Sequence, residues 1–193
     1  KYIFMKIPQL KKKPTIKKYH KIEWIDNYSW IHQKNILEVL KDKSKLDNEV
    51  RTYLEAENKF TEKNMQDTKD LQKKLFDEIK GRIKLEDESL PFRDKKYDYW
   101  TKTTTKSNYF IKLRKKIGSQ KEEVIWNGDK EKLKLNTSYF GLGDISISNN
   151  DKYMAYSLDT KGSEYYTINF RNLSTGKDLK DKINNTTGSI TFT

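Results

Sequence analysis

The second half of the sequence repeats itself, and this repeat constrains the fold more than any other feature. Five residue pairs keep the same residue type and the same spacing of 57 positions, as from Arg114 to Arg171. The pairs are Tyr99 and Tyr156, Thr103 and Thr160, Tyr109 and Tyr166, Ile111 and Ile168, and Arg114 and Arg171. Repeats of about 40 to 60 residues made of short strands are typical of β-propellers, whose sheets stack around an axis. We therefore expect two such sheets after Pro91, with a third opening at Ile190 and Phe192.

Alternation of apolar and polar residues predicts where the strands of this half lie. The expected strands are 97–103, 109–114, 122–126, 145–148, 153–157, 165–170 and a short one near Leu179. Turn-forming clusters at 149–151 and 174–176 separate some of them. The alternating segment 188–193 is also predicted to be a strand, whose partner would lie elsewhere.

Before Pro91 the apolar spacing is that of helices, with steps of three and four residues. The two apolar stripes are Val50, Tyr53, Leu54 and Phe60, and Leu71, Leu75, Phe76 and Ile79. Asp47 and Asp67 are placed to cap two helices at their amino ends, and Gly81 suits the end of the second. We expect two antiparallel or bent helices whose stripes belong to a core.

The first 46 residues are expected to begin in an extended conformation, because Pro8 and Pro14 disfavour a helix. Trp24, Tyr28 and Trp30 follow in a segment too short to bury them. We expect these aromatic side chains to dock on another part of the molecule.

The net charge of +12 suggests a nucleic-acid or membrane partner, but the composition argues against both. Only five of the 40 basic residues are arginines, and planar, bidentate recognition of phosphate favours arginine. We expect the lysines to form a solvent-exposed surface and not a binding site. No apolar run reaches the roughly 18 residues of a membrane span.

The absence of cysteine excludes disulfides and a cysteine nucleophile. Two histidines without cysteine also disfavour a structural zinc site. We expect no cofactor, no metal and a cytoplasmic location.

Several segments resemble the oligopeptidase B branch of the prolyl oligopeptidase family of serine peptidases. They are Asp26–Trp30 (DNYSW), Val50–Asn58 (VRTYLEAEN), Leu75–Ile83 (LFDEIKGRI), Asp87–Arg93 (DESLPFR) and the region 146–164. The resemblance covers nearly the whole chain and implies an α+β fragment from the amino-terminal part of a longer enzyme. Residues 1–85 would be an arm and helical segment that packs on an α/β-hydrolase catalytic domain, completed by later sequence. Residues 86–193 would form the first two blades, and the start of a third, of a seven-bladed β-propeller.

The resemblance also implies a reaction: hydrolysis of short peptides after Lys or Arg by a Ser, Asp and His triad with an oxyanion hole. The propeller would admit short peptides and exclude folded proteins. The partners would be peptide substrates and the catalytic domain of the same chain, in a monomer.

None of the catalytic parts is expected in these residues. The sequence has no Gly-x-Ser-x-Gly motif, and His20 and His32 are expected to be surface residues and not general bases. We therefore assign no catalytic, cofactor-binding or metal-binding residue. Glu55, Glu57, Asp87 and Glu88 are likewise not assigned to selection of a basic side chain.

Two other functions fit parts of the pattern. A propeller that binds a partner without catalysis would share the repeat, but would not explain the VRTYLEAEN segment. A basic nucleic-acid binder is supported by net charge alone.

Overall fold

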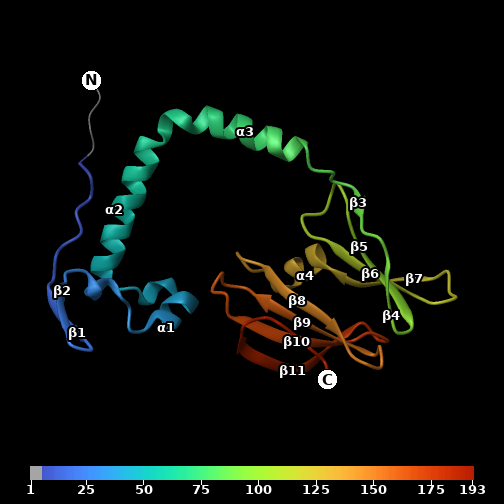
Figure 1. Cartoon of the computed structure of the whole chain (residues 1–193). Coiled ribbons are helices and arrows are strands. Elements are labelled where there is room, and N and C mark those ends of the chain that lie inside the picture. The colour runs from blue at the N-terminus through green and yellow to red at the C-terminus, as the bar shows by residue number, and fades with distance from the viewer. Residues whose placement is uncertain (1–5) are drawn as a thin grey trace. The chain divides into compact units, whose positions relative to one another are not determined.

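The computed structural model describes residues 6–193. The chain divides into two compact units, Lys1–Arg82 and Ile83–Thr193 (Figure 1). Sheets hold most of the second unit and helices most of the first.

The first unit begins with an extended segment and a hairpin that was not predicted. Strands β1 (Thr15–Tyr19) and β2 (Ile22–Asp26) pair antiparallel, with His20 in the turn at a φ of 54°. Three short helical segments follow: η1 (Ser29–Ile31), α1 (Ile36–Lys41) and η2 (Lys43–Lys45). Residues 6–14 form no helix, as Pro8 and Pro14 predicted for this part of the chain.

The two predicted helices form as α2 (Asn48–Asn64) and α3 (Lys69–Gly81), with the 3₁₀ turn η3 (Gln66–Thr68) between them. Asp47 caps α2, since its Oδ1 accepts from the backbone N–H of Glu49 (2.9 Å) and Val50 (3.1 Å). The predicted cap by Asp67 is wrong. Asp67 lies inside η3, and the backbone of Thr68 is already helical where a capping residue would be extended.

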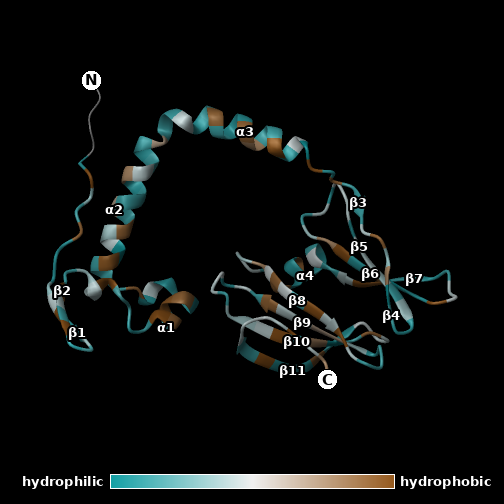
Figure 2. Cartoon of the chain, viewed as in Figure 1, coloured by the Kyte–Doolittle hydropathy of each residue, from teal (hydrophilic) through white to brown (hydrophobic). Residues whose placement is uncertain are grey.

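The expectation that the apolar stripes belong to a core is wrong for the α3 stripe within this unit, whereas the α2 stripe is partly buried, with Tyr53 and Phe60 half-buried and Leu54 exposed. Val50 is the only large apolar side chain of the described part of the unit that is fully buried. Brown apolar positions recur along α3 in Figure 2, and Leu71, Phe76 and Ile79 are each more than half exposed. The stripe is therefore a surface in this unit and not part of its core.

The second unit contains two antiparallel sheets joined by a helix. The first sheet consists of β3 (Asp87–Glu88), β4 (Phe92–Asp94), β5 (Tyr97–Thr103), β6 (Ile111–Lys116) and β7 (Glu122–Asn127). Its order is β3-β5-β6-β7, with β4 also paired to β5. The helix α4 (Gly128–Leu135) leads to the second sheet, β8 (Gly141–Ile147), β9 (Tyr153–Asp159), β10 (Tyr166–Asn172) and β11 (Lys177–Thr186). Neighbours in this sheet are also neighbours in the chain.

Each predicted strand up to Leu179 is present. The bounds of β5 match the prediction, the other strands have shifted ends, and β11 is longer than expected. The sequence did not predict β3, β4 or α4. The predicted strand over 188–193 does not form. The backbone N–H of Ile190 instead donates to Asp144 Oδ2 at 3.0 Å.

The repeated residues occupy corresponding strands. Tyr99 on β5 and Tyr156 on β9 are both buried, and Arg114 and Arg171 lie on the strands that follow. The register differs by two residues: Tyr99 is opposite Arg114, whereas Tyr156 is opposite Asn169. Because side chains alternate between faces, a shift of two leaves tyrosine and arginine on the same face in both sheets.

The core of the second unit lies between the two sheets. Trp126 from β7 and Tyr156 from β9 meet with ring centroids 5.0 Å apart, and Tyr109 meets Phe140 at the same separation. Tyr99, Ile125, Met154 and Leu158 complete the buried cluster. The two sheets therefore stack face to face.

Candidate functional site

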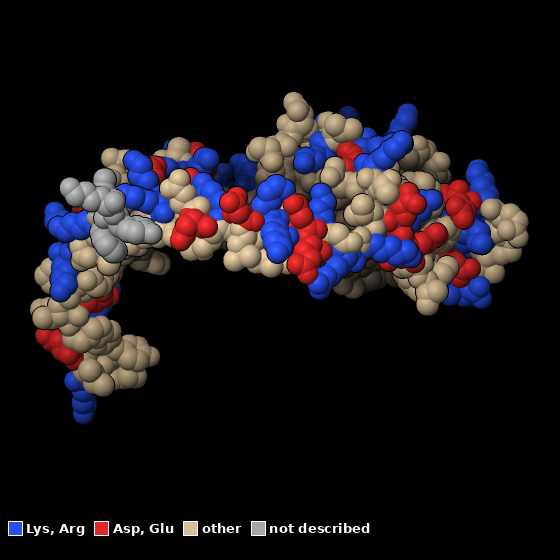
Figure 3. Space-filling model, turned by 90° about the horizontal axis from the view of Figure 1, so that it is seen from above, with Lys and Arg blue, Asp and Glu red and all other residues tan. Residues whose placement is uncertain are grey.

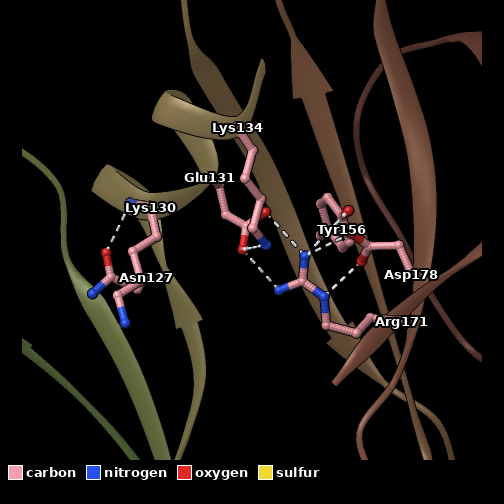
Figure 4. Close-up of polar contacts among 7 residues, drawn as sticks. All are labelled: Asn127, Lys130, Glu131, Lys134, Tyr156, Arg171 and Asp178. Atoms are coloured by element: carbon pink, nitrogen blue, oxygen red, sulfur yellow. Dashed lines mark hydrogen bonds and ion pairs between the residues drawn. The ribbon is translucent and has the colours of Figure 1, made fainter. Parts of the chain in front are cut away.

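A buried cluster of charged side chains joins α4 to the second sheet (Figure 4). Glu131 comes from α4, Tyr156 from β9, Arg171 from β10 and Asp178 from β11. Arg171 and Glu131 are each only 6% exposed. A charged pair this deeply buried must have its hydrogen bonds satisfied to be tolerated.

Local sequence places α4 so that Glu131 reaches the sheet. Asn127 caps the helix by accepting from the N–H of Lys130 (3.0 Å), and Asn136 ends it in the left-handed conformation. The carboxylate of Asp129 accepts from the backbone N–H groups of Asn108 and Tyr109. The helix is thus attached to the β5–β6 loop at its first turn and to the second sheet through Glu131.

Arg171 lies between two carboxylates, as Figure 4 shows. Its Nη1 and Nη2 donate to the two oxygens of Glu131 at 2.9 and 3.0 Å, and its Nε and Nη2 donate to Asp178 at 2.6 and 3.1 Å. The hydroxyl of Tyr156 is 3.5 Å from Nη2. These bonds use the planar fork geometry of a guanidinium, which an ammonium group lacks.

The electrostatics of the cluster fix its charges near neutral pH. Burial opposes a charge on Arg171 and acts to lower its pKa. The hydrogen bonds that Arg171 donates to Asp178 and Glu131, together with the negative charge of Glu131, outweigh this effect and raise the pKa of the guanidinium. Burial is the largest single influence on Asp178 and acts to raise its pKa, but the hydrogen bond and charge of Arg171, together with the Tyr156 hydroxyl and Lys134, lower the pKa overall. Burial, reinforced by Asp178, raises the pKa of Tyr156. Groups with pKa values this far from neutrality are poor proton shuttles, so the cluster is suited to joining elements and not to acid–base catalysis.

A related arrangement surrounds Arg114 in the first sheet. Its Nε donates to Glu123 on β7 at 2.8 Å, and its guanidinium carbon lies 4.2 Å from the centre of the Tyr97 ring. Its Nη1 donates to the backbone carbonyl of Asp151 at 2.9 Å, which links it to the second sheet. Each sheet thus has a buried arginine on one strand that pairs with a carboxylate on the next. The sequence repeat identified both arginines. Their partners Glu123 and Asp178 could also have been predicted, because each is an acidic residue on the strand that follows its arginine.

A polar cleft of about 520 Å³ lies beside both arginines, lined also by Glu123, Leu173 and Ser174. Both guanidinium groups already donate to carboxylates at this position. Both arginines of this cleft are therefore already paired, and Lys121 also contributes to its lining.

The residues that were considered for chemistry and left unassigned are dispersed. His20 and His32 are exposed, and the ring of His20 packs against Tyr19 with centroids 4.2 Å apart. Glu57 accepts from the hydroxyl of Tyr53, and Asp87 pairs with Lys84 at 2.7 Å. Glu55 and Glu88 are exposed. Across residues 6–193, no three acidic or histidine side chains are grouped so as to hold a metal ion.

The aromatic residues of the first unit have different environments. Trp30 donates its Nε1–H to the carbonyl of Lys11 at 2.9 Å, and the ammonium of Lys13 lies 4.1 Å from its ring centre. Trp30 also lines a groove of about 550 Å³ with Leu10 and Tyr53. Trp24 and Tyr28 remain exposed.

The surface charge is mixed. On the face drawn in Figure 3, basic and acidic side chains lie among one another. This agrees with a solvated lysine-rich surface. No helix in the described part of the chain is both long and apolar enough to cross a membrane.

Comparison with known proteins identifies relatives along nearly the whole chain. Residues 8–193 match the family model of the prolyl oligopeptidase N-terminal beta-propeller domain. The chain is 33% identical to dipeptidyl aminopeptidase BI of Pseudoxanthomonas mexicana, in an alignment that covers 92% of this chain and 25% of the relative. It is 23% identical to Protease 2 of Moraxella lacunata, covering 94% of this chain and 25% of that protein.

Two solved structures share the fold. Oligopeptidase B from Leishmania major superposes with a TM-score of 0.79 at 22% identity, over 95% of this chain and 27% of that one. Oligopeptidase B from Trypanosoma brucei, with covalently bound antipain, gives 0.75 at 23% identity, over 96% and 27%. The chain thus spans about a quarter of the length of these relatives. On the match over residues 8–193, the chain belongs to the prolyl oligopeptidase family and comprises its amino-terminal propeller-domain region.

Proposed function

We propose that this chain is the amino-terminal, non-catalytic part of a serine-type oligopeptidase that hydrolyses short peptides after Lys or Arg. Residues 86–193 would supply the first two blades and the start of the third in a seven-bladed propeller. The ring would restrict access to small, flexible substrates. The peptidase relatives support the reaction class, and the resemblance of VRTYLEAEN and LFDEIKGRI supports the oligopeptidase B branch.

The observation that carries the proposal is the face-to-face stacking of two sheets whose strands follow chain order. Trp126 and Tyr156 pack between the sheets, and Arg114 donates from the first sheet to the Asp151 carbonyl of the second. A sheet stacked on its sequence neighbour in this way is the repeating element of a propeller.

The exposed apolar surface of the first unit supports a catalytic domain as its partner. Ile16, Ile22 and Ile25 of the hairpin are each more than 60% exposed, as are Phe76 and Ile79 of α3. Burying one such side chain contributes about 1.5–3 kcal/mol. We assign the covering surface to an α/β-hydrolase domain of the full-length protein.

A second peptidase activity is favoured by one comparison. The relative that is 33% identical is named a dipeptidyl aminopeptidase, an activity that releases dipeptides from a free amino terminus. Cleavage after Lys or Arg inside a peptide needs no free amino terminus, so the two activities differ in a measurable way.

The deciding experiment digests two matched peptide sets with the full-length protein and identifies the products by mass spectrometry. One set has free amino termini and the other has acetylated ones, and both contain Lys, Arg and neutral residues at varied positions. Cleavage after Lys or Arg in both sets supports the proposal. Dipeptide release confined to the free set supports the second activity, and cleavage unrelated to Lys or Arg refutes the oligopeptidase B assignment.

A propeller that binds a partner without catalysis remains the non-enzymatic alternative. The gene beyond codon 193 separates the two, since the enzyme requires a Gly-x-Ser-x-Gly motif followed by Asp and His. Labelling of the full-length protein by a fluorophosphonate would identify a reactive serine directly, and absence of labelling would favour the binding module.

We also propose a monomeric, cytoplasmic enzyme. The cysteine-free sequence is compatible with a reducing compartment. Cell fractionation and sedimentation of the full-length protein test these two points.

A further inference from the structure

In each sheet of the second unit, one glycine that follows the last strand is in close contact with one of the repeated tyrosines. A Cβ added to Gly128, directly after β7, would lie 2.4 Å from the Cβ of Tyr109. A Cβ added to Gly188, after β11, would lie 2.9 Å from Cγ and Cδ2 of Tyr166. Tyr109 and Tyr166 are one of the pairs separated by 57 positions. A glycine therefore lies against a repeated tyrosine at the exit of both sheets, against its Cβ in the first and against its ring in the second.

The second contact is enclosed on two sides. A Cβ on Gly143 of β8 would also lie 2.9 Å from the Tyr166 ring, so this ring is packed between Gly143 and Gly188. Real Cβ atoms do not approach other atoms this closely, and a methyl group at Gly188 would displace either the ring or the outgoing backbone.

Hydrogen bonds hold the outgoing chain in the same place. Ser157 Oγ, fully buried, donates to the carbonyl of Gly188 at 2.5 Å and accepts from the N–H of Asp144 at 2.8 Å. Asp144 Oδ2 in turn accepts from the N–H of Ile190 at 3.0 Å. At the first exit, the N–H of Gly128 donates to the carbonyl of Phe110, and Asp129 accepts from Tyr109.

Residues 188–190 lie on one particular face of the second sheet. Ser157 is adjacent to Tyr156 on β9, so the two side chains point to opposite faces of the second sheet. Tyr156 packs against Trp126 of the first sheet. The segment 188–190 is therefore held on the face away from the first sheet, where a stack of sheets needs its next member.

We propose that Gly128 with Tyr109, and Gly188 with Tyr166, are equivalent crossover contacts that direct the chain from the last strand of one sheet to the first strand of the next. This inference rests on the proposed ring and identifies residues that set its geometry.

The test compares Gly188→Ala with Gly176→Ala in the full-length protein. Both glycines have a positive φ, 95° and 68°, so alanine is strained at either position, but no atom lies within 4 Å of a Cβ added to Gly176. Hydrogen exchange of peptides that contain Asp144 and Ile190 is followed by mass spectrometry. Exchange is expected to be about tenfold faster in Gly188→Ala than in Gly176→Ala, because the crossover opens locally.

A second substitution keeps the test decisive if Gly188→Ala does not fold. Removing the ring with Tyr166→Ala vacates the space that the new methyl group needs. The backbone strain at a φ of 95° remains in the double variant, so Gly188→Ala is expected to accelerate exchange by a smaller factor in the Tyr166→Ala background than in the unsubstituted protein. Equal exchange in Gly188→Ala and Gly176→Ala, or no relief in the double variant, overturns the proposal.

The first crossover offers an independent comparison. Gly128→Ala is expected to accelerate exchange at Asn108 and Tyr109, whereas Gly81→Ala, with no atom within 4 Å of its added Cβ, has no effect there. These readouts do not depend on peptidase activity. Failure of the cleavage assay therefore bears on the proposed function, and failure of the exchange comparison bears on the crossover contacts.

Discussion

At the scale of single residues, the two buried arginines show how charged side chains are accommodated in the core of the second unit. Removing a charge from water is unfavourable unless partners replace the lost hydrogen bonds. Arg171 has Glu131 and Asp178, and Arg114 has Glu123 and a backbone carbonyl. Sequence alone identified the arginines through their spacing. It could not identify Glu131 as a partner, because 40 positions and an unpredicted helix separate it from Arg171.

Substituting Glu131→Gln should destabilise the protein strongly, because it leaves Arg171 buried with a single carboxylate. The expected loss in free energy of unfolding is about 3–5 kcal/mol. Asp77→Asn is the control, since it breaks the exposed Lys73–Asp77 pair and should cost less than about 0.5 kcal/mol. Denaturant unfolding of the full-length protein measures both, and equal effects would show that the Glu131 contact contributes no more than a surface pair.

Tyr99 should make stability fall at alkaline pH. Burial raises the pKa of its hydroxyl to about 12. In an unfolded chain the Tyr99 hydroxyl loses its proton from about pH 10, whereas in the folded protein it keeps the proton up to about pH 12. The contribution of Tyr99 to the free energy of unfolding is therefore fully present below about pH 10 and is lost as the pH rises towards 12. Tyr99→Phe should flatten this alkaline loss, whereas Tyr19→Phe, at a residue 66% exposed, should not. Unfolding free energies at neutral pH and at about pH 11 test this, and parallel losses in the two variants would contradict it.

At the scale of elements, local signals predicted what local interactions determine. The Asp47 cap, the break between α2 and α3, and the strand β5 all follow from residues near one another in sequence. The helix α4 was missed because Leu133 is 80% exposed and the helix is attached through Asp129 and Glu131, not through an apolar stripe. The segment 188–193 has the composition of a strand, but a strand also requires a neighbour to pair with. The two-residue difference in register was equally inaccessible, since it depends on the pairing of β9 with β10.

The two predicted caps provide a direct test of this distinction. Asp47→Ala removes the acceptor for two N–H groups of α2 and should cost about 1 kcal/mol. Asp67→Ala removes no capping bond and should be close to neutral. Hydrogen exchange of the first turn of α2 in the full-length protein should accelerate only in Asp47→Ala. Acceleration by both substitutions would show that neither effect comes from the cap.

At the scale of the whole molecule, the two units differ in how they bury apolar residues. The second unit has a core of aromatic and aliphatic side chains between its sheets. The first has the sequence pattern of core-forming helices, yet its apolar stripe is exposed. Sequence periodicity predicts that a face will be buried but cannot say by what. The mismatch is explained if the covering surface belongs to the remaining three quarters of a protein of the relatives' length.

The stripe on α3 therefore should behave as core in the full-length protein. Phe76, 62% exposed here, should be buried there, so Phe76→Ser should lower the free energy of unfolding by about 3–5 kcal/mol. Lys74 lies on the same helix and is also exposed, and Lys74→Ser should change the free energy by less than about 1 kcal/mol. Because both substitutions introduce serine into one helix, the difference between them isolates burial of the stripe from helix propensity. A similar small effect of both would mean that the stripe stays in solvent, and the arm would then need another explanation than docking on a catalytic domain.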